Sequence, residues 1–303
     1  MPSVHTLQNE YWQAGVLPET GASLAFGRIQ QEGAWHDVLR PTPEASTGNS
    51  SACSSFVMLP WCNRIKGGVL RFGGQEYALR TAKDDGTARH GDVRGRAWQV
   101  EIAEAARIRL TFRSSDYADI NWPFPFSARL DYTLNGREFI WALMLKNESD
   151  HPAPAGFGHH PYFVRPVGEE VEVQIPCGEY FPLTNFMATG EPQPIPPELD
   201  FRKPRDLDER ELNHLLTGRI IPQPAKLAYP ARRIRLAFHS APVFAHWLIF
   251  APQGQPFVAL EPMTNASDGF NLLADGHEGG GVFILQPGEE KMGIVRLVLE
   301  SAG

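Results

Sequence analysis

An all-β fold, a large antiparallel two-sheet β-sandwich with very little helix, is predicted by three features of the sequence. Short runs of alternating apolar and polar residues recur along the chain, patterns with helical spacing are scarce, and 28 glycines and 26 prolines separate the runs. Alternation is typical of strands with one buried face, and glycine and proline are typical of turns. The 303 residues show no linker or repeat, so we expect one domain over 1–303.

Five runs are the clearest strand candidates, at 108–112, 130–134, 171–175, 234–238 and 294–299. The first four alternate strictly, so one face of each strand is expected to be buried and the other more polar. The run at 294–299 is almost continuously apolar and predicts a more deeply buried final strand.

The best candidate for a helix is the segment 206–216, because Leu212, Leu215 and Leu216 would share a face of a helix there. The proline-rich segment 191–197 is expected to be a loop, since proline lacks the N–H that a central strand needs.

Charge and hydropathy exclude several classes of partner. The net charge is −7 and no basic run stands out, which disfavours a nucleic-acid face. No apolar stretch approaches the roughly 20 residues that cross a bilayer, and the first residues lack a basic start and an apolar segment. We therefore expect a cytoplasmic protein, monomeric or homodimeric, without membrane or nucleic-acid partners.

The cysteines and histidines do not have metal-site spacing. Cys53, Cys62 and Cys177 are odd in number and contain no CxxC pair, so buried free thiols are expected rather than disulfides or zinc ligands. Ten histidines occur without an HExxH or comparable pattern. We expect no metal and no cofactor.

Four segments place titratable or polar residues where the alternation breaks. They contain, in order, Asn63 and Arg64, then His90, then His160 and Tyr162, and finally Glu261. Each residue alone is as well explained by a surface charge, a turn or a strand end. A histidine and a carboxylate brought together, however, are sufficient to move two protons on one substrate.

In their order and context, these segments resemble the aldose 1-epimerase (galactose mutarotase) family. The resemblance covers nearly the whole chain and rests on short motifs: N-R-I at 63–65, H-G at 90–91, H-P-Y-F at 160–163, T-G-E-P at 189–192, D-F-R at 200–202, E-P at 261–262 and Q-P-G-E at 286–289. It implies a galactose mutarotase-like sandwich with a sugar bound on one concave sheet.

The resemblance also implies roles for particular residues. His160 matches the general acid and Glu261 the general base, while Arg64 and His90 match residues that bind the sugar; Asn63 and Tyr162 are further candidates for sugar binding. The family's sugar-binding aspartate has no clear counterpart. Asn213 stands at the best-matching position, and Asp208 is the other candidate.

The implied reaction suits these residue types. Interconversion of anomers opens a cyclic hemiacetal, so a proton leaves the C1 hydroxyl while another reaches the ring oxygen. A carboxylate is an acceptor at neutral pH, and histidine, with an ordinary pKa of about 6.5, can supply a proton. A free aldohexose is the expected substrate.

Three alternatives remain open. A hexose-6-phosphate 1-epimerase would need a cationic cluster, which Arg89, Arg94 and Arg96 would supply. A non-catalytic carbohydrate-binding protein would not require an acid–base pair. A glycoside hydrolase is less favoured, because it usually needs two carboxylates and only Glu261 lies in a motif.

Overall fold

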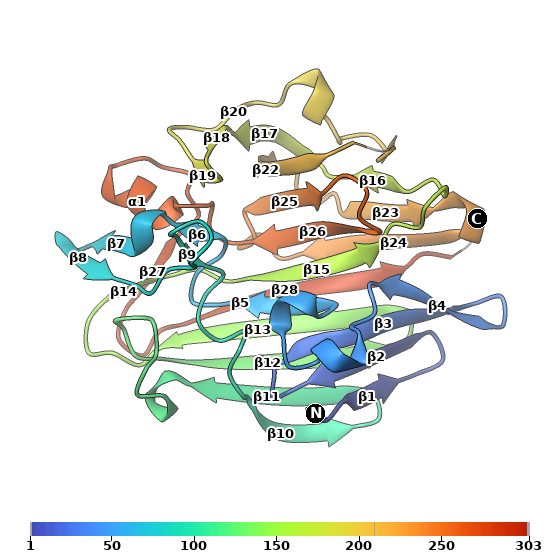
Figure 1. Cartoon of the computed structure of the whole chain (residues 1–303), viewed down its shortest axis with the longest axis horizontal. Helices are drawn as coiled ribbons and strands as arrows, with labels where there is room; N and C mark the ends of the chain where they lie inside the picture. The colour runs from blue at the N-terminus through green and yellow to red at the C-terminus, as the bar shows by residue number, and fades with distance from the viewer. Residues whose placement is uncertain (1, 209, 302–303) are drawn as a thin grey trace.

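Two large antiparallel sheets dominate the computed structural model, which describes residues 2–208 and 210–301 (Figure 1). Residues 1, 209, 302 and 303 lie outside the described residues, and with them both ends of the expected 1–303 domain. The prediction of a large antiparallel β-sandwich with little helix is confirmed. The one α-helix among the described residues, α1, spans only Gly269–Ala274. No described helix has the length and apolar character needed to span a membrane.

The first sheet carries most of the candidate site. Its strand order is β1 (His5–Gln8), β2 (Trp12–Leu17), β3 (Ser23–Gln31), β4 (Ala34–Leu39), β15 (Gly158–Val164), β26 (Phe257–Met263), β25 (His246–Ala251), β22 (Leu212–Arg219), β17 (Cys177–Phe181) and β20 (Gln193–Pro194). Strand β5 (Ser55–Met58) lies off this path and pairs with both β15 and β3.

The second sheet has the order β10 (Gln99–Glu104), β11 (Arg107–Arg113), β12 (Phe126–Asn135), β13 (Glu138–Asn147), β28 (Glu290–Leu299), β24 (Ile234–Ser240), β23 (Ala225–Tyr229), β16 (Glu172–Gln174) and β21 (Arg205–Asp206). Four small two-stranded sheets pair β6 (Arg64–Ile65) with β9 (Ala88–Arg89), β7 (Val69–Phe72) with β8 (Gln75–Ala78), β14 (Ala153–Ala155) with β27 (Phe283–Leu285), and β18 (Leu183–Thr184) with β19 (Met187–Ala188). The four runs predicted from alternation and the apolar run at 294–299 lie in or overlap strands of the second sheet: β11, β12, β16, β24 and β28. The deeper burial expected for 294–299 is wrong, because burial alternates along β28 and Ile294 is 37% exposed.

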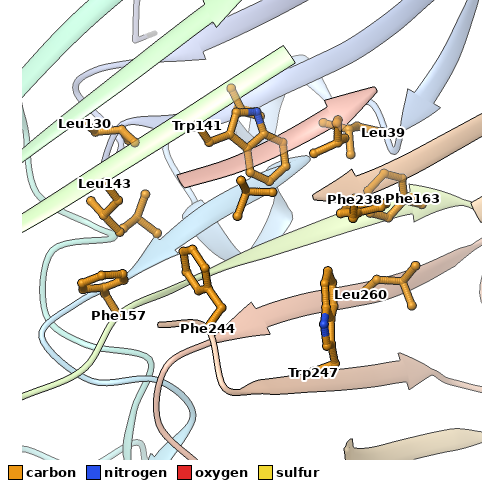
Figure 2. Close-up of a cluster of buried hydrophobic side chains, with 14 of the residues drawn as sticks. Leu39, Leu130, Trp141, Leu143, Phe157, Phe163, Phe238, Phe244, Trp247 and Leu260 are labelled. Carbon is orange, nitrogen blue, oxygen red and sulfur yellow. The ribbon is translucent and has the colours of Figure 1, made fainter. Parts of the chain in front are cut away.

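The core fills the space between the sheets, where large side chains from both meet (Figure 2). Phe163 of β15 and Phe238 of β24 have ring centroids 5.1 Å apart, and Trp247 of β25 lies 5.6 Å from Phe238. Such interlocked rings hold the first sheet at a fixed position, because each inward side chain fits between those of the opposite sheet. The three cysteines are free and buried, as expected.

The helix predicted at 206–216 is wrong. Residues Leu212–Arg219 form β22, which pairs with β25 and β17. Leu215 and Leu216 point to opposite faces of this strand and enter different apolar clusters. Burial on both faces favours a central strand over a one-sided helix, so tertiary pairing overrides the helical spacing. The prediction that all of 191–197 is a loop is also wrong, because Gln193–Pro194 forms β20. This strand lies at the edge of the first sheet, where proline is tolerated.

Candidate active site on the first sheet

Neighbouring strands of the first sheet bring His160 and Glu261 face to face. Strands β15 and β26 are antiparallel, with Gly158 opposite Met263 and Tyr162 opposite Ala259. His160 and Glu261 lie midway between these pairs, so their side chains share one face of the sheet. His160 Nε2 is 3.1 Å from Glu261 Oε1. The contact is nearly dry, because only 5% and 1% of the two residues is exposed.

Aromatic rings fix the orientation of the His160 imidazole. Phe56 of β5 stacks on it with a centroid distance of 4.5 Å, and Tyr162, two residues along β15, lies at the same distance on a tilted plane. Because both neighbours project from strands of the same sheet, the imidazole has little freedom to turn away from Glu261.

His90 and Arg64 reach the pair from the small β6–β9 sheet, in which Arg64 is paired with Arg89. The His90 ring is edge-on to the His160 ring at 5.3 Å, and its Nδ1 lies 3.1 Å from Met58 Sδ. Gly91 makes this approach possible: with φ of 72°, it passes so close to Leu59 that a Cβ would lie 2.0 Å from the Leu59 carbonyl oxygen.

Asn63 organises the loop that carries Arg64 and His90. Its backbone is left-handed (φ 55°), and its carbonyl accepts a hydrogen bond of 2.7 Å from the His90 N–H. Its side-chain oxygen accepts from Arg64 Nη1 at 3.0 Å and from the Ser267 hydroxyl at 3.3 Å. Arg64 also donates through Nε to Asp85 at 2.9 Å. The guanidinium is therefore held at two points, and Phe186 lies over it at 4.5 Å.

Burial controls the ionisation of the pair. It raises the pKa of Glu261 well above the ordinary value, with the nearby Arg64 charge acting in the opposite direction. Burial, together with the positive charges of Arg94, Arg40 and Arg64, also lowers the pKa of His160 to about 3. Both directions favour neutral partners, so we assign the resting pair one proton, on Glu261, in contact with a neutral imidazole.

Two polar atoms of the pair remain available. Among the described residues, neither His160 Nδ1 nor Glu261 Oε2 has a hydrogen-bond partner. Buried polar atoms are seldom left unsatisfied, and those that are require a reason. A hydroxyl-bearing ligand would satisfy such atoms, which makes the arrangement suited to binding and proton transfer together.

A family model described as aldose 1-epimerase matches residues 3–297 of this chain. The chain belongs to the aldose 1-epimerase family. The uncharacterized protein YphB of Escherichia coli K12 is 25% identical over 283 residues, covering 89% of this chain and 92% of its own. The chromosomal LacX protein of Lactococcus lactis is 28% identical over 240 residues, covering 72% of this chain and 77% of its own.

Solved structures of the same fold include a galactose mutarotase-like protein from Clostridium acetobutylicum, with a TM-score of 0.84 at 17% identity over 98% of this chain and 94% of that one. The aldose epimerase homologue from C. elegans has a TM-score of 0.84 at 18% identity, with all of both chains covered. The galactose 1-epimerase of Lactobacillus acidophilus NCFM has a TM-score of 0.78 at 16% identity, over 98% and 94% of the two chains. At these identities the likeness establishes the mutarotase fold.

Neither candidate for the family's aspartate contacts the acid–base pair. Asn213 faces the same side of the sheet as Glu261, but it pairs with Phe250 on β25, and the residue in line with Glu261 on β22 is Leu215. Asp208 lies in an exposed turn and forms an ion pair of 3.1 Å with Arg210. A sugar that touched Asn213 would extend across β25 from Glu261, whereas Asp208 is engaged elsewhere.

Most of the aromatic residues that the sequence offered as sugar platforms are core residues instead. Trp61, Trp98, Trp122 and Phe163 are at most 5% exposed and belong to the main cluster between the sheets. Only Tyr162 of the five lies beside His160. Phe56 and the 46%-exposed Phe186 are the rings that the sequence did not single out. Neither is in a distinctive motif: the register of β5 against β15 places Phe56 beside His160, and Phe186 is found through its contact with Arg64.

Asn265 is a further residue of structural importance that sequence reasoning did not identify. Its side chain accepts a hydrogen bond from the Cys62 N–H at 2.9 Å and donates to the Cys62 carbonyl at 3.2 Å. It thereby ties the loop before Asn63 to the strand that carries Glu261. Across residues 2–208 and 210–301, no three His, Cys, Asp or Glu side chains are grouped so as to hold a metal ion; that the chain uses no metal or cofactor stays a prediction.

Proposed function

We propose that the protein is an aldose 1-epimerase that interconverts the α and β anomers of an aldohexose, with His160 as general acid and Glu261 as general base. The observation that carries the proposal is the 3.1 Å contact between His160 Nε2 and Glu261 Oε1 in a buried part of the first sheet. Membership of the aldose 1-epimerase family supports epimerase chemistry, and the assignment of these two residues is ours.

The proposed reaction conserves protons at each step. The Glu261 carboxylate accepts the proton of the C1 hydroxyl while protonated His160 donates one to the ring oxygen, and the C1–O5 bond breaks to give the open-chain aldehyde. Rotation about C1–C2 presents the other carbonyl face. The reverse transfers then close the ring, returning one proton to His160 and taking one from Glu261. The two oxygens are bonded to the same carbon, so the acid and the base must lie close together.

The resting pair already contains the one proton that this cycle needs. In the empty site the proton lies on Glu261, since burial disfavours both charged forms. A bound sugar supplies hydroxyl groups to both residues, and Arg64 stabilises a negative charge on Glu261. Transfer of the proton to His160 within the pair then gives the imidazolium and carboxylate that the reaction uses.

Arg64, His90, Asn63 and Tyr162 are proposed to position the sugar. Arg64 is suited to binding a hydroxyl oxygen, because its guanidinium is fixed by Asp85 and Asn63. His90, whose pKa is lowered well below the ordinary value mainly by burial, with the nearby Arg94, Arg64 and Arg89 charges acting in the same direction, is neutral at pH 7 and can accept or donate one hydrogen bond.

Polarimetry on freshly dissolved α-D-glucose and α-D-galactose tests the proposal. An epimerase accelerates the relaxation without changing the final rotation, and the acceleration scales with protein concentration. A non-catalytic carbohydrate binder would leave the relaxation rate at the buffer value while still binding sugar by calorimetry.

A further inference from the structure

Two arginines next to His160 have no carboxylate partner among the described residues. Arg40 lies over the Tyr162 ring, with Cζ 4.0 Å from its centroid, and Arg94 lies over the Phe56 ring at 5.2 Å. Those are the two rings that contact the His160 imidazole. Each guanidinium is therefore one aromatic ring away from the proposed acid.

The same two guanidinium groups converge on Ser51. Arg40 Nη2 donates to the Ser51 carbonyl at 3.4 Å and to the Cys53 carbonyl at 3.0 Å, while Arg94 Nη1 donates to the Ser51 hydroxyl at 3.2 Å. Both arginines are half-buried, and Ser51 is exposed. Two like charges are thus held together beside exposed Ser51, and burial lowers the pKa of each.

The other arginines of this region are neutralised by carboxylates. Arg89 contacts Asp84 at 3.1 Å and Asp85 at 3.3 Å, and Arg96 contacts Asp92 at 2.7 Å and Asp119 at 2.8 Å. Of the arginines 89, 94 and 96 that the sequence offered as a phosphate cluster, only Arg94 keeps its charge available. The structure adds Arg40, which is distant in sequence and comes from the end of β4.

We propose that the preferred substrate is an aldose that carries an anionic group away from C1, and that Arg40, Arg94 and the Ser51 hydroxyl bind this group. The inference rests on the proposed epimerase function. A guanidinium presents a planar set of N–H donors that matches the oxygens of a carboxylate, sulfonate or phosphate, and a half-buried pair of such groups gains most from an anion. An anion held beside exposed Ser51 would leave the neutral hemiacetal end of the sugar to face His160 and Glu261.

The test compares anomeric exchange rates by NMR magnetisation transfer for four sugars: D-glucose, D-glucuronate, glucose 6-phosphate and 6-deoxy-6-sulfoglucose. We expect the wild type to favour one or more of the charged sugars over glucose in kcat/KM, and the best of the three identifies the anion. Arg40→Gln and Arg94→Gln are each expected to lower the charged-to-neutral ratio of kcat/KM about 10- to 100-fold, the effect of losing one charge-assisted hydrogen bond.

Arg96→Gln is the matched control, because it removes the same charge two residues from Arg94 while its guanidinium already contacts Asp92 and Asp119. Its charged-to-neutral ratio should equal that of the wild type. The ratio is independent of the amount of folded protein, so partial misfolding of a variant does not alter it. A wild type that prefers glucose, or Arg40 and Arg94 variants with an unchanged ratio, would overturn the anion site and leave the epimerase intact. No acceleration on any of the four sugars, nor on α-D-galactose in the polarimetric test, would refute the proposed function itself, and the anion site with it.

Discussion

His160 Nε2 and Glu261 Oε1 lie 3.1 Å apart on adjacent antiparallel strands, with less than a tenth of either residue exposed. The register of β15 and β26 determines this relationship, since a slip of one residue would turn one of the two side chains to the opposite face of the sheet.

Non-additive loss of activity is expected when both members of the pair are changed. His160→Asn should lower kcat about 10²- to 10⁴-fold, the typical contribution of a positioned acid or base. Because acid and base act in one concerted cycle, the double variant His160→Asn/Glu261→Gln should be little worse than the poorer single variant. Steady-state polarimetry on all three variants checks this, and strictly multiplicative losses would show that the two residues act independently.

Asp85→Asn should weaken the hold on Arg64. Burial alone would raise the pKa of Asp85, but hydrogen bonds from Arg64 and Thr87 lower this pKa to about 2. Loss of the charged partner frees the guanidinium, so we expect KM to rise about 10-fold with a smaller change in kcat. Asp84→Asn is the control, since exposed Asp84 contacts Arg89 and not Arg64. A fall confined to kcat in the Asp85 variant would contradict a role in sugar positioning.

Gly91→Ala should destabilise the fold by more than about 2 kcal/mol, because its Cβ would lie 2.0 Å from a backbone oxygen in addition to the strain of positive φ. Gly73 also has positive φ (61°) but open space around it, so Gly73→Ala should lose only about 1 kcal/mol. Urea unfolding of the two variants separates overlap from backbone strain. Equal losses would mean that the loop at Gly91 can move away from Leu59.

Stability is expected to fall as the solution is made acidic. Burial lowers the pKa of His159 to about 3 and of His246 to about 4, as it does for His160. Between these values and about 6.5, the unfolded chain binds protons that the folded protein does not, so the free energy of unfolding decreases as pH falls. Glu261 acts in the opposite direction, since its raised pKa makes the folded state hold a proton that the unfolded state loses above about 4.5.

His159→Phe isolates one of these contributions. His159 packs against Trp141 with a centroid distance of 5.1 Å, and neither of its nitrogens has a described partner. The variant should show a pH slope smaller by about 1.4 kcal/mol per pH unit between pH 4.5 and 6, the effect of one proton. Urea midpoints across that range measure it, and an unchanged slope would place the acid sensitivity elsewhere.

The strand pattern and the fold class were predictable from sequence because alternation records which face of a strand is buried. Leu215 and Leu216 were misread since a doubly buried strand has no alternation, and only its pairing with β25 and β17 distinguishes it from a helix. His160 and Glu261 were found through motif resemblance. Their convergence could not be predicted, as strand order and register depend on the packing of the whole sheet.

The anion-binding end of the proposed site likewise could not be predicted from local sequence. Arg40 and Arg94 are 54 positions apart in the sequence, and no local pattern links them; the structure relates them through Ser51. Conversely, Arg89 and Arg96 looked equivalent to Arg94 in sequence, and only their ion pairs with aspartates distinguish them.

The rate of α-to-β exchange in the Glu261→Gln variant tests the central claim most directly. The substitution keeps the shape of the side chain and removes the proton acceptor, so exchange catalysed by the wild type on its best sugar should fall at least about 100-fold. Glu179→Gln on β17, an exposed position of the same sheet, should retain the wild-type rate. A Glu261→Gln protein that exchanges anomers as fast as the wild type would contradict the assignment of Glu261 as the base.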